Sequence, residues 1–201
     1  MADLNWPGIL WGAMSLVTMP DYASMSDDRL MARFALRLDR SAFDMVVERF
    51  TRPALAVAMQ RLADRSLAED AVQETFLRVI RSRDCYDARR PFAPWFYAIL
   101  RNVLVDLSRR QNRQRHAVAD LAARTPRDAG FPAPPHGTGA SDLLQRLPAG
   151  ERDVLTLRVI EGMPFRDVAV ALAISEEAAK KRAQRGLARL RASVLASAKA
   201  S

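Results

Sequence analysis

The sequence predicts an all-α protein made of two small helical domains joined by a flexible linker. Apolar residues recur at intervals of three and four over residues 26–115 and again over 142–197, which is the spacing of amphipathic helices. No segment alternates as a half-buried strand would. Between the two parts lies "RTPRDAGFPAPPHGTGAS", which has too few periodic apolar residues to form a core. We therefore expect a linker over 116–141. Residues 1–25 are expected to be a disordered extension, or the product of a start codon assigned too far upstream.

The N-terminal domain is expected to contain five helices. Ser26, Ser41 and Ser66 are predicted to cap three of them, because a serine side chain accepts hydrogen bonds from the free backbone N–H groups at a helix start. Pro53 suits the first turn of another helix, where its missing N–H has no intrahelical partner to lose. A turn-rich loop over 84–94 then leads into the fifth helix.

That fifth helix, "PFAPWFYAILRNVLVDLSRRQNRQR", is aromatic at its start and cationic at its end. Asn102, Asp106, Arg109 and Arg113 recur at intervals of four, three and four, so they share one polar face. Asparagine suits contacts to base edges, and arginine suits phosphates. Trp95 is either a stacking surface for an unpaired base or a core residue. The pattern is compatible with a nucleic-acid surface, a membrane surface, or a core helix with a solvated tail.

The C-terminal domain is expected to contain four short helices, the second over 151–161 with Val159 among its buried residues and the third over 165–173. Ser175 is predicted to cap the fourth. The apolar stripe expected on that helix comprises Ala183, Leu187, Leu190 and Val194. Basic residues follow on the opposite face. A short helix, a tight turn and a basic second helix are typical of a helix-turn-helix, whose second helix enters the DNA major groove. The alternative is an ordinary solvated amphipathic helix.

The bulk composition narrows the function classes. The net charge of +8 and a pI near 10.6 favour a polyanionic partner, either nucleic acid or an anionic membrane. One cysteine and two histidines provide neither an internal disulfide nor a metal site, and no phosphate-binding glycine loop is present. We expect no cofactor and no enzymatic activity. The apolar run 9–19 is too short to span a bilayer and lacks a basic flank, so a cytoplasmic location is expected.

Two long motifs resemble a known family. "LAEDAVQETFLRVIRS" followed by "PFAPWFYAILRNVLVDLSRR" resembles region 2 of the extracytoplasmic-function (ECF) class of bacterial sigma factors. "LPAGERDVLTLRVIEGMPFRDVAVALAISEEAAKKRAQRGLARLR" resembles region 4 of the same class. The likeness covers about residues 27–115 and 142–194. Because both motifs occur in the right order and separation, the pair is far more specific than either helix alone.

The resemblance implies protein partners for both domains. The acidic helix of region 2 would bind the β′ clamp of core RNA polymerase, and region 4 would bind the β flap. An anti-sigma factor that covers both domains is a further implied partner. The implied polymerase-binding residues are Glu69, Asp70, Gln73 and Glu74.

The resemblance also implies two promoter contacts. Region 2 would recognise and melt the −10 element by trapping flipped-out bases, without ATP hydrolysis. Its implied −10 residues are Arg89, Arg90, Trp95, Ile99, Asn102, Arg109, Arg110 and Arg113. Region 4 would read the −35 duplex. Its implied residues are Arg166, Ser175, Ala178, Lys180, Lys181, Arg182 and Arg185.

The sequence departs from the family at three positions in the recognition helix. Ala178 and Ala179 stand where a Thr-Val pair is common, which puts the −35 sequence preference in doubt. Gly186 stands where alanine is usual and should cost about 1 kcal/mol of helix stability.

Two other readings compete with an initiation factor. An autonomous helix-turn-helix regulator explains residues 142–197 equally well but leaves the acidic helix and "PWFYAILRN" without a role. A decoy that sequesters an anti-sigma factor would not need the basic residues Lys181 and Arg185. Membrane binding fits poorly with Asn102 and Asp106 on the polar face.

Overall fold

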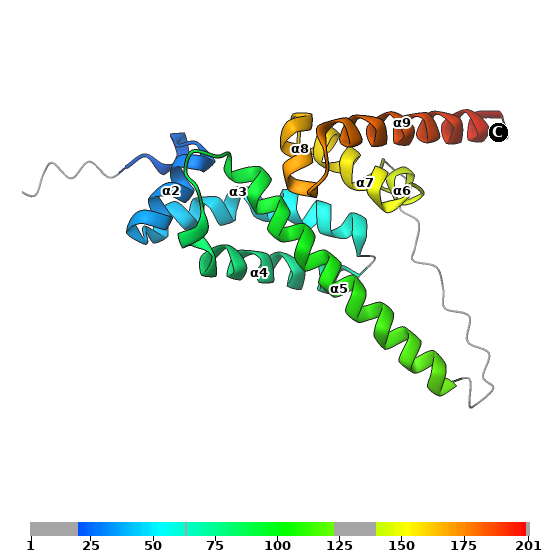
Figure 1. Cartoon of the computed structure of the whole chain (residues 1–201), viewed down its shortest axis with the longest axis horizontal. Helices are drawn as coiled ribbons and strands as arrows, with labels where there is room; N and C mark the ends of the chain where they lie inside the picture. The colour runs from blue at the N-terminus through cyan, green and yellow to red at the C-terminus, as the bar shows by residue number, and fades with distance from the viewer. Residues whose placement is uncertain (1–19, 63, 123–139, 200–201) are drawn as a thin grey trace, which may run out of the picture.

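The computed structural model describes residues 20–62, 64–122 and 140–199, which are almost entirely helical and contain no strand (Figure 1). The all-α prediction is confirmed. Short helical turns precede and follow the first three long helices, η1 at Tyr22–Ser24 and η2 at Arg83–Cys85. The N-terminal helices are α2 Asp27–Arg37, α3 Arg40–Arg61, α4 Arg65–Arg81 and α5 Phe92–Ala122. The C-terminal elements are α6 Ala140–Gln145, α7 Ala149–Leu155, the π-helical turn η3 Thr156–Ile160, α8 Phe165–Leu172 and α9 Glu176–Lys199.

The helices of the N-terminal domain begin at acidic caps more often than the serine pattern predicts. Ser26 caps α2 as expected. The predicted caps Ser41 and Ser66 are wrong, because the side chains of Asp39 and Asp64 cap α3 and α4 two residues earlier. An aspartate accepts the same backbone hydrogen bonds as a serine, and its charge also complements the positive end of the helix dipole.

Pro53 lies inside α3 instead of starting a separate helix, so the prediction of two helices over this stretch is wrong. An internal proline removes one backbone hydrogen bond and costs about 3 kcal/mol. Phe50, Ala54 and Ala58 flank it on the buried face of α3. Their packing keeps the helix continuous through the proline, which local propensity does not anticipate.

The core of the N-terminal domain is a cluster of aromatic rings. The rings of Phe34 and Phe43 stack with centroids 4.4 Å apart. Phe50 meets Phe96 at 4.8 Å and Phe92 at 5.0 Å. Through these contacts the start of α5 is anchored on α3, and the loop before it is fixed against the domain.

The second predicted helix of the C-terminal domain is split into α7 and the π-helical turn η3. Val159 lies on that turn and is 66% exposed, so its predicted burial is wrong. The wider turn rotates its side chains relative to an α-helix, which moves Val159 away from the core. Gly162 ends the element with φ +66°, a left-handed conformation that suits glycine.

The stripe that α9 buries matches the predicted one only in part. Ala183 is buried as predicted, and Leu190 is partly buried against the core. Leu187 and Val194, expected inside, are 41% and 49% exposed. Ala179 and Gly186 are buried in addition. The helix is turned so that its smallest residues face α7, because these permit the closest approach between the two helices.

The two domains pack against each other. The first half of α5 lies along α8, and α3 meets α6 and α7 (Figure 1). Residues 116–122 of the predicted linker belong to the end of α5, and 123–139 lie outside the described residues. None of the helices in the described ranges is long and apolar enough to cross a membrane.

Candidate nucleic-acid and protein interfaces

One face of α4 carries the four residues predicted to bind polymerase. Asp70 and Gln73 are exposed, while Glu69 and Glu74 are partly buried. Arg65 Nε donates to Glu69 Oε1 at 2.8 Å across one helical turn. The structure therefore brings the four residues together on one helix, with Asp70 and Gln73 as its most accessible members.

Arg78 is a residue of this surface that the sequence reading missed. Its Nε donates to Glu74 Oε1 at 2.8 Å and its Nη1 to Asp106 Oδ2 at 3.2 Å, so it links α4 to α5. The hydrogen bond from Arg78 lowers the pKa of Glu74 below its ordinary value, which keeps this carboxylate charged. Asp70 and Arg110 line the same polar hollow between the two helices. The spacing of four between Glu74 and Arg78 was a signal that could have revealed the pair.

Arg89 and Arg90 lie in the loop before α5 and are organised by Asp87, which the sequence reading also missed. Asp87 Oδ1 accepts hydrogen bonds from the backbone N–H and the Nε of Arg89, each at 3.0 Å. Arg90 Nε lies 3.7 Å from Asp87 Oδ2. The hydrogen bond from Arg89 lowers the pKa of Asp87. The arginine side chains remain exposed to solvent and accessible to a ligand.

Trp95 is half-buried at the start of α5, so part of its ring packs against the core and part remains accessible to solvent. Its ring packs 5.2 Å from the ring of Tyr86 and 6.0 Å from that of Phe92. The Tyr86 hydroxyl donates to the backbone carbonyl of Arg90 at 3.1 Å, which ties the loop to the aromatic cluster. Tyr86, Arg90 and Trp95 line a cavity of about 320 Å³.

The other predicted −10 residues of α5 lie on the side of the helix where Trp95 lies, and they are Ile99, Asn102, Arg109, Arg110 and Arg113. Ile99 and the exposed Asn102 line a hollow at the end of α4. Further along, Arg109, Arg110 and Arg113 line a second hollow. The predicted residues thus divide among separate hollows along α5, aromatic at one end and cationic at the other.

The helix-turn-helix forms as predicted from α8 and α9. Ser175 Oγ accepts a hydrogen bond from the backbone N–H of Ala178 at 3.1 Å, so Ser175 caps α9. Ala173 ends α8 in a left-handed conformation with φ 51° and ψ 49°. This single left-handed residue reverses the chain direction tightly enough to pack α8 on α9.

The basic residues of this motif differ in their accessibility. Lys180 and Lys181 are exposed, and each pairs with a glutamate one turn earlier at 2.6 Å. Arg182 is half-buried against Gly150 of α7. Arg185 is exposed and forms no ion pair with another described residue. Arg166, at the start of α8, is exposed with its Nε 3.5 Å from Asp167 Oδ1.

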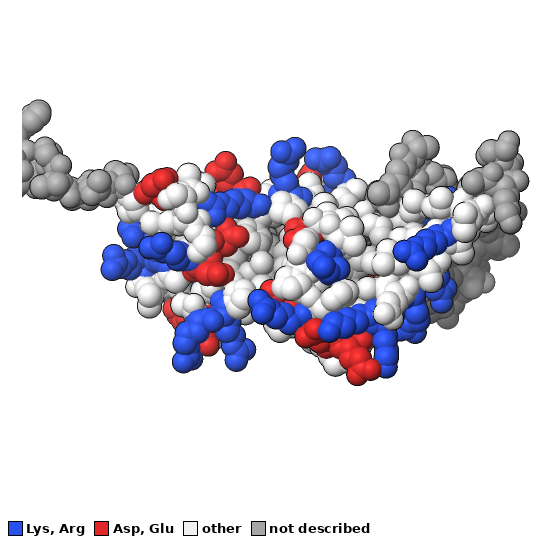
Figure 2. Space-filling view, turned by 90° about the horizontal axis from the view of Figure 1, so that it is seen from above, with Lys and Arg blue, Asp and Glu red and all other residues white. Residues whose placement is uncertain are grey.

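Basic side chains are spread over both domains on the face drawn in Figure 2, where they are interleaved with acidic ones. This arrangement differs from a single basic patch on one domain. A helix-turn-helix beside a second helical domain with an aromatic and cationic loop is the architecture of a two-domain DNA-binding protein.

Comparisons with known proteins identify the family. The family model described as Sigma-70 region 2 matches residues 46–114, and the one described as Sigma-70, region 4 matches residues 140–190. RNA polymerase sigma factor CarQ of Myxococcus xanthus is 32% identical over 157 residues, covering 76% of this chain and 88% of CarQ. ECF RNA polymerase sigma factor SigD of Mycobacterium tuberculosis is 30% identical over 204 residues, covering 94% and 96%. The chain belongs to the ECF class of the sigma-70 family of RNA polymerase sigma factors.

Solved structures agree with this assignment. The structure of CnrH in complex with the cytosolic domain of CnrY matches with a TM-score of 0.64 and 28% identity, covering 85% of this chain and 97% of that one. The sigma factor RpoE of Bartonella quintana, in complex with the anti-sigma factor NepR, matches with a TM-score of 0.60 and 22% identity and shows the same fold.

Proposed function

We propose that this ECF sigma factor directs core RNA polymerase to promoters through three surfaces. Residues Glu69, Asp70, Gln73 and Glu74 on α4 bind the polymerase clamp. The loop before α5 and the polar side of α5 bind and open the −10 element. The exposed residues of α8 and α9 read the −35 element. The observation that carries this proposal is the continuous sequence of groups along α5, from Trp95 through Asn102 to Arg113.

The chemistry of α5 suits a strand that is being unpaired. Stacking on an aromatic ring is worth about 1–3 kcal/mol per base and is available to any base. Trp95 supplies such a ring in the lining of a cavity. Asn102 supplies hydrogen-bond donors and acceptors in the hollow that it lines together with Ile99. Arg109, Arg110 and Arg113 supply charge for the phosphates that follow. Opening therefore proceeds by capture of exposed bases and needs no nucleotide hydrolysis.

An anti-sigma factor is proposed as a third partner. Two solved structures similar to this chain are complexes of a sigma factor with a protein partner, CnrY in one and the anti-sigma factor NepR in the other. We propose that this chain is regulated in the same way, by a protein that covers both domains.

Run-off transcription tests the proposed function. Purified chain and core polymerase are incubated with fragmented genomic DNA and compared with core polymerase alone. Specific transcripts that share a two-block upstream motif are the expected result. Sequence-specific DNA binding by the chain alone, without transcripts, would instead indicate an autonomous regulator. If the chain shows neither transcription nor sequence-specific DNA binding, it acts as a decoy.

A further inference from the structure

The start of α5, the helix proposed to open the −10 element, lacks a local side chain that could cap it. α5 begins at Phe92, and the preceding residue, Pro91, has no hydrogen-bond acceptor in its side chain. The backbone N–H groups in the first turn of a helix have no partner within that helix. Phe92 is fully buried, so water does not reach its N–H. This donor therefore needs a partner from another part of the protein.

Asp28 on α2 is that partner. Its Oδ1 accepts a hydrogen bond from the backbone N–H of Phe92 at 2.6 Å, and the two residues are 64 positions apart in the sequence. A hydrogen bond to a charged acceptor is stronger than one between neutral groups. The negative charge at this place also complements the positive end of the α5 dipole. The helix is thus capped by a residue of a different helix, which no local pattern around Phe92 indicates.

Asp28 also lies close to the loop before α5. Burial, together with the negative charges of Asp28 and Asp87, raises the pKa of the Tyr86 hydroxyl to about 12. The hydroxyl therefore stays protonated near neutral pH, and it donates to the backbone carbonyl of Arg90 at 3.1 Å. α2 contacts both η2 and α5, the elements at the two ends of this loop (Figure 1). One carboxylate of α2 is thus near both the loop and the first turn of α5.

The chain that leads to Asp28 is fixed by one arginine of α3. Arg49 Nη1 donates to the Met25 carbonyl at 2.7 Å and to Asp27 Oδ1 at 2.8 Å. Its Nη2 donates to the Ala23 carbonyl at 2.6 Å. The planar guanidinium group holds several acceptors at once in a fixed geometry. The position of Asp28 is therefore set by contacts within the N-terminal domain.

The capped turn carries groups that are proposed to receive the −10 strand. Trp95 follows Phe92 by three residues, and the two rings pack with centroids 6.0 Å apart. Arg90 precedes Phe92 by two residues and lines the same cavity as Trp95. A binding site works well only when its groups are held within about 0.5 Å of the productive geometry. A shift at Phe92 would move both an aromatic ring and a cation away from that geometry.

We propose that Asp28 is a positioning residue for promoter opening, because its bond to the Phe92 N–H fixes the start of α5 and the loop before it in the orientation that captures −10 bases. This inference rests on the proposed function of α5 and its loop. Asp28 acts through the backbone and not through DNA. Its loss should therefore impair capture of the −10 bases and leave recognition of the −35 element intact.

The test compares the wild-type chain with Asp28→Ala, which removes the acceptor, and with Asp28→Asn, which keeps an acceptor oxygen without the charge. Asp44→Ala is the matched control, since it makes the same substitution at an exposed position of α3. Amide hydrogen exchange of the full-length chain, followed over residues 86–96, measures the cap directly. Permanganate reactivity of the −10 thymines and affinity for a −35 duplex are measured with the holoenzyme.

Asp28→Ala should make exchange at the start of α5 roughly tenfold faster, as expected when a hydrogen bond to a charged group is lost. The reactivity of the −10 thymines should fall by a similar factor, while affinity for the −35 duplex stays unchanged. Asp28→Asn should recover most of both effects, and Asp44→Ala should match wild type. If Asp28→Ala loses helical signal, Arg49→Lys replaces it with the same expected direction, because lysine keeps the charge and loses the forked geometry.

Three results would overturn the positioning role. Unchanged exchange in Asp28→Ala would show that the carboxylate does not hold the start of α5. Faster exchange with unchanged thymine reactivity would show that this contact does not affect opening. Equal losses of thymine reactivity and −35 affinity would make Asp28 a residue needed only for folding. Thymines that stay protected with the wild-type holoenzyme would contradict the proposed function instead, and the exchange rates would still decide whether Asp28 caps α5.

Discussion

Several charged residues in this chain are positioned by neighbouring charged residues that the sequence analysis did not single out. Arg89 and Arg90 were predicted as a pair of cations, but Asp87 fixes the conformation in which they are presented. Glu74 is a predicted polymerase-binding residue, and Arg78 holds it charged and joins it to α5. At this scale the function of a residue depends on the group that positions it.

Loss of Arg185 is expected to weaken promoter binding by about 1–3 kcal/mol if its guanidinium reaches a base edge, and Lys181→Ala should act in the same direction. Arg185 is exposed and forms no ion pair with another described residue, so none of these residues competes with DNA for its charge. Gln184→Ala, at the neighbouring exposed position, is the control. Binding is measured with holoenzyme on promoter fragments at fixed salt. Unchanged −35-dependent transcription in both variants would contradict the assignment.

Acid should selectively remove the stabilising contribution of Asp39. Its carboxylate accepts a hydrogen bond from Arg33, another from the Ala42 backbone and another from Tyr22, and the bond from Arg33 is the main cause that lowers its pKa below 3.8. A group with a lowered folded pKa stabilises the protein above its unfolded pKa, and this contribution is lost as the pH falls through the folded value. Urea unfolding should therefore show a difference between wild type and Asp39→Asn that is constant near neutral pH and shrinks below about pH 4. A difference independent of pH would contradict this role.

The helical character of each segment was predicted correctly, but several helix boundaries were not. The helix-turn-helix, the start of α2 and the loop before α5 all follow from local chemistry that acts within a few residues. Local chemistry does not predict the continuity of α3 through Pro53, because that continuity depends on burial of the neighbouring helix face. Local chemistry does not predict the orientation of α9 either, since the predicted and the observed stripes both consist largely of small or apolar residues. Only packing on α7 chooses between them.

Gly186 is expected to allow close packing of α9 against α7. The sequence analysis considered only its cost to the stability of the helix. A Cβ at this position would lie 2.8 Å from Cδ1 of the buried Leu155. Gly186→Val should therefore destabilise the C-terminal domain by roughly 1–3 kcal/mol through overpacking. Ala188→Val places the same side chain at an exposed position of α9 and should be nearly neutral. Thermal unfolding of both variants checks this, and equal effects would refute the close-packing role.

Ala173→Gly is expected to stabilise the helix-turn-helix. Ala173 is held at φ 51°, a left-handed conformation that costs an alanine roughly 1 kcal/mol and costs glycine almost nothing. Most of that amount should be recovered, measured as an increase in the free energy of unfolding. Ala188→Gly, which substitutes glycine within a regular helix, should lower it by a similar amount. A loss of stability in both variants would show that the turn is not strained.

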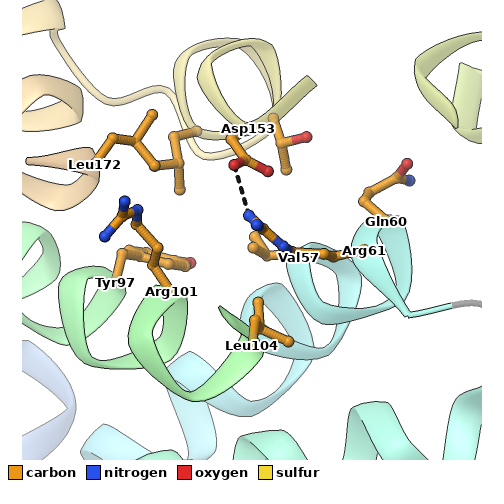
Figure 3. Close-up of a pocket in the computed structure, with 10 residues that line it drawn as sticks. Val57, Gln60, Arg61, Tyr97, Arg101, Leu104, Asp153 and Leu172 are labelled. Carbon is orange, nitrogen blue, oxygen red and sulfur yellow. Dashed lines mark hydrogen bonds and ion pairs between the residues drawn. The ribbon is translucent and has the colours of Figure 1, made fainter. Parts of the chain in front are cut away.

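At the scale of the whole molecule, the two-domain organisation could be predicted but the way the domains meet could not. The contact between Arg61 and Asp153 (Figure 3) joins positions 92 residues apart, and no local pattern in the sequence links the two positions. The candidate surfaces for polymerase and DNA were predicted from the resemblance of two sequence motifs to a known family. The contact between α8 and the aromatic end of α5 was not predicted, because it depends on how the surfaces of the two domains fit together.

Promoter opening is the central function proposed for this chain, and permanganate footprinting measures it directly, because unpaired thymines react and paired ones do not. With core polymerase and the wild-type chain, thymines of the −10 element should become reactive without any hydrolysable nucleotide. Trp95→Ala should reduce that reactivity while −35 binding is retained. Thymines that stay protected with the wild-type holoenzyme, although the promoter is bound, would contradict the account.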